Sequence, residues 1–291
     1  MPYDGLSKPE DKQVIEVKQN LLESITNTFT TWSSLVTAHA RPYYHYSMLN
    51  GIGSEIDLLY NEAVRLTRSL KSIIPRSMTD RNYFLTIPER GYRAYTGLFY
   101  SALFNVGMED MVVPPHVTNV GFWGYKIRQG QLHLLADSIH AGSCATGGII
   151  SNHGYVSFSF GRETQGGLFI NNGSTGYFGL NSDGVYINNG VVKWSMGMNA
   201  PNGVFINYNA TKEMGDTAKG GLFISTTPIA RFLRFAKNAR GITYKQIDYK
   251  QIDIHKTLHQ LLNELQTADV SAIITKVKDI ELHCKTHYDP R

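Results

Sequence analysis

A recurring glycine constrains the fold of this chain more than any other feature. Between Gly142 and Gly221 a glycine returns every six or seven residues, with one shorter step and with Asn209 in one glycine position. The glycines are Gly142, Gly148, Gly154, Gly161, Gly167, Gly173, Gly179, Gly184, Gly190, Gly197, Gly203, Gly215 and Gly221. A unit this short cannot bury an apolar face by itself, so consecutive units must stack on one another. The spacing therefore predicts a solenoid.

Every third glycine opens a near-copy of one short strand, which adds a longer period of 17 to 19 residues. The copies cover residues 148–152, 167–171, 184–188, 203–207 and 221–225. Each period then contains three glycine-marked corners, and glycine suits a corner because it admits positive φ and close contact between coils. The sequence therefore predicts a mainly β solenoid of five to six coils with about 18 residues per coil.

Helical patterns flank the repeat on both sides. Apolar residues recur there at steps of three and four, which is the spacing of one helix face. On the N-terminal side, the predicted helices cover residues 11–40, 47 or 54 to 73, and 92–106. On the C-terminal side, residues 229–239 are predicted to form a basic helix and residues 254–285 a long amphipathic pattern, as one helix or as two with a break near residues 267–269.

Paired prolines separate the N-terminal helices from the repeat. Pro114 and Pro115 can neither continue a helix nor lie in a central strand. Residues 117–141 have weaker glycine spacing and predict one or two degenerate first coils, because terminal repeats cap a stack. The expected division is a helical region over 1–113, a β-helix over 114–227 and a second helical region over 228–291.

Side-chain alternation assigns two faces to each strand copy. The residue after the glycine and the residue two further on are aliphatic in most copies, so we expect that face to form the interior. The residue between them would point outward and stack from coil to coil at about 4.8 Å. The resulting outer aromatic wall is the candidate interaction face, formed by Phe169, Tyr186, Phe205 and Phe223. Three roles are open for such a wall: the flanking helices cover it, a partner protein docks on it, or a sugar stacks against it.

Asparagine follows the strand in four of the five copies, at Asn152, Asn171, Asn188 and Asn207. The chain must turn at this point, and asparagine tolerates left-handed backbone and can form hydrogen bonds along the stack. We therefore predict a structural turn ladder at these four positions. A ligand-binding column is the alternative.

The glycine runs at residues 166–179, 197–203 and 215–221 resemble the GXGXG β-helix repeat. That repeat occurs in the C-terminal domain of the glutamate synthase large subunit and in the C subunit of formylmethanofuran dehydrogenase. The resemblance covers residues 142–225, about a third of the chain. It implies a right-handed β-helix that serves as a scaffold and spacer between catalytic parts and has no catalytic residues of its own.

Composition narrows the function classes. A net charge of +4, spread along 291 residues, is too small and too dispersed to predict nucleic-acid binding. The N-terminal residues lack the apolar segment of a secretory signal, and no run of 18 apolar residues could span a membrane. Two cysteines, Cys144 and Cys284, make no disulfide framework. We therefore expect a cytoplasmic protein without a membrane segment.

Motifs for catalysis are weak. Two i, i+4 histidine pairs, His255 with His259 and His283 with His287, have a spacing that can share a metal, but neither pair holds an acidic base between its members. The sequence spells no phosphate loop and no nucleophile elbow. The carboxylates of the repeat are expected at turns, not in the paired column of a glycosidase: Glu163, Asp183, Glu213 and Asp216. No catalytic residue, cofactor or metal site is predicted.

These observations favour a non-catalytic scaffold or assembly protein that acts through protein–protein contacts, with a protein partner or as a homo-oligomer. Solenoid ends need capping, and long terminal helices suit self-association. Two alternatives are open. The resemblance implies a subunit of an enzyme complex like glutamate synthase or formylmethanofuran dehydrogenase. An outer aromatic wall would instead suit carbohydrate binding at Tyr186 and its neighbours.

Overall fold

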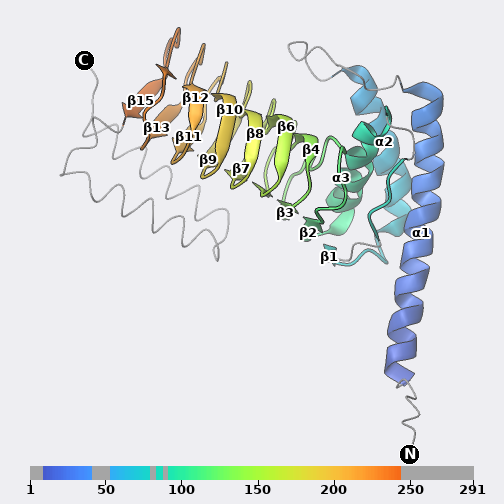
Figure 1. Ribbon diagram of the computed structural model, residues 1–291. Helices are drawn as coiled ribbons and strands as arrows, with labels where there is room; N and C mark the ends of the chain where they lie inside the picture. The colour runs from blue at the N-terminus through green and yellow to red at the C-terminus, as the bar shows by residue number, and fades with distance from the viewer. Residues whose placement is uncertain (1–8, 41–52, 79–82, 88–90, 244–291) are drawn as a thin grey trace, which may run out of the picture.

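The structure is a computed structural model that describes residues 9–40, 53–78, 83–87 and 91–243. It confirms the β-solenoid, with about seven turns of about 18 residues each and with helices at the N-terminal end. Two sheets, each made of parallel strands, run along the stack (Figure 1). Residues 244–291, including the predicted helix over 254–285 and both histidine pairs, lie outside the described residues.

Six of the coils contribute one strand to each sheet, and the coils at the two ends contribute a strand to the larger sheet only. The nine-stranded sheet consists, in spatial order, of β1 (Ser77–Met78), β2 (Asp110–Val113), β3 (Gln131–Leu134), β5 (Ile149–Asn152), β7 (Gln165–Asn171), β9 (Asp183–Asn188), β11 (Val204–Asn207), β13 (Leu222–Ser225) and β15 (Arg240–Thr243). The six-stranded sheet consists of β4 (Ser138–Ala141), β6 (Tyr155–Phe160), β8 (Ser174–Phe178), β10 (Val191–Met196), β12 (Thr211–Met214) and β14 (Arg231–Phe232). The strand register of the nine-stranded sheet matches the period of the strand copies in the sequence. Phe169 pairs with Tyr186, Tyr186 with Phe205 and Phe205 with Phe223.

The helices gather at the β1 end of the stack (Figure 1). They are α1 (Pro9–His39), α2 (Ser54–Thr67) with the 3₁₀ turn η1 (Arg68–Leu70), and α3 (Thr96–Gly107), which follows the 3₁₀ turn η3 (Arg93–Tyr95). The three predicted N-terminal helices are thus confirmed, and we call them together the helical cap. The prediction for residues 229–239 was wrong: β14 and turns occupy this segment, and the repeat continues to Thr243. The basic residues there sit in one more coil, whose glycine corner is replaced by Leu233 at φ 51°.

The helical cap closes the first coil through close backbone contact. A Cβ at Gly97 of α3 would lie 2.1 Å from the carbonyl oxygen of Gly121, so only glycine lets the helix approach this far. The Ser101 hydroxyl donates to the Phe122 carbonyl at 2.9 Å and accepts from the Tyr125 amide at 3.0 Å. The cap therefore supplies the polar and apolar partners that a further coil would otherwise provide.

The aromatic residues of the strand copies lie inside the solenoid, so the predicted orientation of the strand faces was wrong. Phe169, Tyr186, Phe205 and Phe223 are 0% exposed. Their rings stack almost parallel, with centroid distances of 4.8, 4.8 and 4.7 Å along the column. We call these four residues the interior aromatic column.

Glycine corners on the opposite side of the coil make room for this column. A Cβ at Gly161 would lie 2.6 Å from Cε1 of Tyr186, and a Cβ at Gly179 would lie 2.6 Å from Cε1 of Phe205. Side chains alternate along a strand, so the aliphatic neighbours of each ring point outward. Both rows are apolar, which is why alternation alone could not choose the inner one.

Candidate interaction surface

The predicted interaction face is closed to any partner. All four residues of the interior aromatic column are buried, and burial raises the pKa of the Tyr186 phenol. The Tyr186 hydroxyl shares a hydrogen bond with Thr164 and donates to the carbonyl of Gly161. A partner protein or a sugar cannot reach these rings while the coil is intact. The column is therefore part of the core.

The predicted turn ladder is a chain of side-chain hydrogen bonds inside the coil. The amide of Asn152 donates to Asn171 at 2.8 Å, that of Asn171 to Asn188 at 2.8 Å, and that of Asn188 to Asn207 at 2.7 Å. Asn207 ends the series by donating to Ser225 at 3.1 Å. All four asparagines are 0% exposed, so the ladder satisfies buried amides from one coil to the next.

A second set of aromatic residues lies on the outer face of the six-stranded sheet. Trp194 of β10 is 37% exposed and packs against Tyr177 of β8 at 4.9 Å and against Phe158 of β6 at 6.0 Å, both between ring centroids. Lys193 lies over the ring of Tyr155 with its amine 3.9 Å from the centroid. We call Tyr155, Phe158, Tyr177 and Trp194 the outer aromatic patch.

Small residues of β8 allow this patch to form. A Cβ at Gly176 would lie 2.5 Å from Cζ3 of Trp194, so the indole occupies the space that any other side chain would fill. Ser174 is the neighbouring outward residue of β8, and both Tyr155 and Val191 pair with it. Side chains of β6 and β10 can therefore meet across β8, which concentrates aromatic surface at one place.

The row of rings continues from the outer aromatic patch along the six-stranded sheet to a buried histidine. His140 of β4 lies 4.9 Å from Phe158 and 5.1 Å from Phe122, measured between ring centroids, and its Nδ1 is 3.0 Å from the hydroxyl of Ser159. Desolvation by burial, together with the charge of Arg162, lowers the pKa of His140 to about 3. The imidazole ring is therefore neutral at physiological pH and packs as one more aromatic ring in the series.

This neutral histidine predicts an acid-sensitive fold. Between pH 6.5 and about 3 the unfolded chain binds a proton at His140 and the folded chain does not, so stability falls as the pH drops through this window. The contribution is roughly 1 kcal/mol per pH unit. Urea unfolding at pH 7.5, 6.0 and 4.5 should show a shallower loss of stability for His140→Phe than for the wild type. Equal slopes in the two proteins would contradict the assignment.

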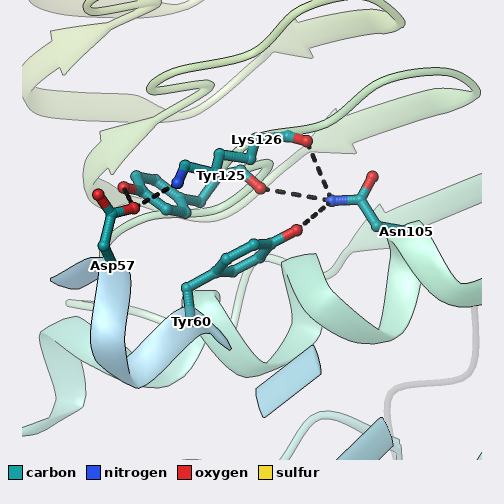
Figure 2. A network of polar contacts seen from close by, with 5 residues as sticks. All are labelled: Asp57, Tyr60, Asn105, Tyr125 and Lys126. Carbon is teal, nitrogen blue, oxygen red and sulfur yellow. Dashed lines mark hydrogen bonds and ion pairs between the residues drawn. The ribbon is translucent and has the colours of Figure 1, made fainter. Parts of the chain in front are cut away.

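A polar network joins the helical cap to the first coil (Figure 2). The Asp57 carboxylate of α2 accepts hydrogen bonds from the Lys126 amine and, at 2.8 Å, from the Tyr125 hydroxyl. Asn105 of α3 donates to the Tyr60 hydroxyl at 2.8 Å and to the Lys126 carbonyl at 3.2 Å. These five residues tie α2 and α3 to the left-handed corner at Lys126.

The protonation states of this network suit a structural contact. Desolvation acts to raise the pKa of Asp57, but the hydrogen bonds from Lys126 and Tyr125 outweigh it, so the pKa lies below its usual value and the carboxylate stays ionised. Burial, helped by the charges of Cys144 and Asp57, raises the pKa of the Tyr125 phenol. Desolvation and then the charge of Glu163 raise the pKa of the Cys144 thiol to about 11. A thiol that is protonated at neutral pH is a poor nucleophile.

The remaining candidate groups do not converge within the described residues. Glu213 pairs with Arg231 at 2.6 Å and Glu163 with Arg162 at 3.0 Å. In residues 9–40, 53–78, 83–87 and 91–243, no group of three or more His, Cys, Asp and Glu could hold a metal ion. Among the helices in these ranges, none combines the length and apolar character of a membrane span.

The outer aromatic patch has a signal in the sequence that the glycine spacing does not contain. Aromatic rings return every 17 to 19 residues outside the glycine-led strands, at Phe122, His140, Phe158, Tyr177 and Trp194. These are the rings that follow one another along the six-stranded sheet. The glycine run over residues 166–179 that resembles the GXGXG repeat contains Tyr177 of this series. No protein-family model, curated protein or solved structure matches the chain.

Proposed function

We propose that the protein is a non-catalytic scaffold that binds a protein partner or a second copy of itself through the outer aromatic patch. One observation carries the proposal: the aromatic residues of the glycine-led strands are buried, whereas Trp194 is exposed on the outer face of the six-stranded sheet in contact with Tyr177 and Phe158. Exposed tryptophan and tyrosine are the residues most enriched at the centres of protein interfaces.

The buried polar groups support a role without catalysis. Cys144 and Tyr125 have raised pKa values and stay protonated at neutral pH, and Asp57 is held by Lys126. Groups in these states hold the cap on the coil and offer neither a general base near pH 7 nor a nucleophile. The resemblance to the GXGXG repeat supports the same proposal, because that repeat serves as a spacer between catalytic parts.

The neighbours of the patch suit a protein partner. Lys193 stacks on Tyr155, and Val191 beside it is 40% exposed, so the surface combines aromatic, aliphatic and cationic groups. Such a surface fits an apolar partner with an acidic rim, since charged residues gather at the rim of an interface. The proposal includes a cytoplasmic location, which is predicted from the sequence alone.

A double substitution tests the proposal. Trp194→Ser with Tyr177→Ser should leave the fold intact and weaken association at least tenfold, because aromatic anchors of this kind contribute about 2 kcal/mol or more each. Association is measured by sedimentation for self-assembly and by quantitative affinity capture from native cells for other proteins. Phe235→Ser, at an aromatic residue that is 68% exposed and lies outside the patch, is the matched control and should bind like the wild type. Unchanged association in the folded double variant would reject the patch as the contact surface.

Carbohydrate binding is a second candidate because the Trp194 indole occupies the space above Gly176 on an open sheet face. Exposed aromatic faces stack on sugar rings as well as on protein. Titration of tryptophan fluorescence with soluble oligosaccharides separates the two: a saturable change that Trp194→Phe removes supports sugar binding. Association with protein in the absence of any such change supports the scaffold.

A further inference from the structure

The nine-stranded sheet has an aliphatic outer face that stands apart from the interior aromatic column. Each ring of that column is flanked by two residues that point outward, as Phe205 is by Val204 and Ile206. Seven of these flanking residues, together with Ile149 of β5, form what we call the aliphatic wall: Ile149, Leu168, Val185, Ile187, Val204, Ile206, Leu222 and Ile224. The eighth flanking residue, Ile170 beside Phe169, is only partly buried. The wall crosses β5, β7, β9, β11 and β13, which are in register.

The aliphatic wall is buried although it points away from the coil interior. None of its eight residues is more than 9% exposed, and none belongs to the core cluster that holds the interior aromatic column. The burial is confined to part of the sheet, because the outward residue Gln131 of β3, next to β5, is exposed. It is also absent from the other sheet, where the outward residues Lys193 and Lys212 are exposed.

The helical cap is in the wrong place to cover the wall. Figure 1 shows α1, α2 and α3 at the β1 end of the stack, beyond β3, whereas the wall begins at β5. An apolar face of this size is rarely left in water. The cover must come from another segment of this chain or from another molecule, and burial within a single copy favours the chain itself.

We propose that residues 254–285 of the same chain dock on the aliphatic wall. The described chain ends at Thr243 in β15, which pairs with β13 and so extends the sheet that bears the wall. The remaining residues carry an apolar pattern at helical spacing in two parts, separated by a gap around residues 267–269: Ile254, Leu258, Leu261, Leu262 and Leu265, then Ile273, Ile274, Val277, Ile280 and Leu282. A helix with such a stripe needs an apolar face to bury it.

The lengths fit. Four strand spacings separate β5 from β13, which is about 19 Å. A helix over residues 254–266 would be about 20 Å long at 1.5 Å per residue. Residues 244–253 can span about 33 Å when extended, which is enough for the chain to turn from the end of β15 onto the outer face. This docking occupies the nine-stranded sheet and is independent of the proposed function of the outer aromatic patch.

Photo-crosslinking of the full-length protein tests the proposal without changing its shape. Photo-leucine, incorporated during expression, places a diazirine at Leu168 and Leu222 in the wall and at Leu135, which is 41% exposed, as the internal control. After irradiation of the monomer fraction and digestion, mass spectrometry should find peptides of residues 254–285 joined to Leu168 or Leu222, and none joined to Leu135. Crosslinks that join two copies, or an absence of crosslinks from the wall to residues 254–285, would overturn the proposal.

A pair of segment variants gives a second measurement. Leu262→Asp with Leu265→Asp interrupts the stripe, whereas Gln260→Asp adds a charge off the stripe and serves as the control. Radical footprinting should then show severalfold more labelling of Leu222 in the double variant and unchanged labelling in the control. Unchanged labelling of Leu222 in a folded double variant would show that another molecule or segment covers the wall.

Discussion

Replacing Phe205 by alanine is expected to lower the free energy of unfolding by about 3 to 5 kcal/mol, the usual range for a fully buried phenylalanine. Phe205 stacks between Tyr186 and Phe223 at 4.8 and 4.7 Å, and its ring fills the space left by the Gly179 corner. The substitution removes two stacking contacts and leaves a cavity between two rigid sheets, which cannot collapse around it. Urea unfolding followed by circular dichroism measures the loss.

An exposed phenylalanine of the same solenoid supplies the control for this measurement. Phe235 is 68% exposed, so Phe235→Ala should change the free energy of unfolding by no more than about 0.5 kcal/mol. The difference between the two variants is the test. Similar small losses in both would place Phe205 on the surface and restore the outward orientation that the sequence alone predicted.

The second large effect is expected at the asparagine ladder. Asn188→Ala should lower the free energy of unfolding by about 2 to 4 kcal/mol. The substitution leaves the side-chain amide of Asn171 and the side-chain carbonyl of Asn207 without their ladder partner in a buried site. Each such group costs about 1 to 3 kcal/mol. The affected bonds are 2.8 and 2.7 Å long. Thermal and urea unfolding of the purified variant measure the loss.

The next residue is a matched control for Asn188. Asn189 is also an asparagine with a neighbour on the previous coil, Asn172 at 3.0 Å, but this pair is exposed to solvent. Asn189→Ala should therefore cost only a few tenths of a kcal/mol, since water replaces the lost bond. A loss at Asn189 as large as that at Asn188 would mean that turn geometry, not the buried ladder, determines the effect.

The period of the solenoid could be predicted from sequence because glycine is required where coils touch. Gly173 shows the reason: a Cβ there would lie 2.0 Å from the carbonyl oxygen of Gly154 on the previous coil. The asparagine positions could be predicted for a similar reason, since a buried amide needs a hydrogen-bond partner, and an asparagine one coil away supplies it. Both features follow from residue type through local sterics and hydrogen bonding, so they can be predicted without knowledge of the tertiary structure.

The choice of inner face could not be predicted in this way. Tyr186 and its neighbours Val185 and Ile187 are all apolar enough for a core, and all three are buried. What decides between them is the width of the coil opposite, where Gly161 leaves room for the Tyr186 ring. That spacing is a property of two strands about 25 residues apart in sequence, and no single-strand pattern contains it.

The outer aromatic patch and the last coil were missed because their strands lack the regular motif. The six-stranded sheet has irregular register, as between Val156 and Ser159, so its residues do not alternate cleanly. In the last coil Leu233 takes the glycine position at positive φ, and the basic residues around it imitate a helix. Stacking on a preceding coil stabilises these strands, and tertiary context of this kind overrides local propensity.

Hydroxyl-radical footprinting of the native protein is the most direct test of where its aromatic surface lies. If the interior aromatic column is core and the outer aromatic patch is the free surface, mass spectrometry will find strong oxidation at Trp194 and almost none at Tyr186 or Phe205 until the protein is unfolded. Oxidation of Tyr186 at a rate comparable with that of Trp194 in the folded protein would contradict this arrangement, and with it the proposed contact surface.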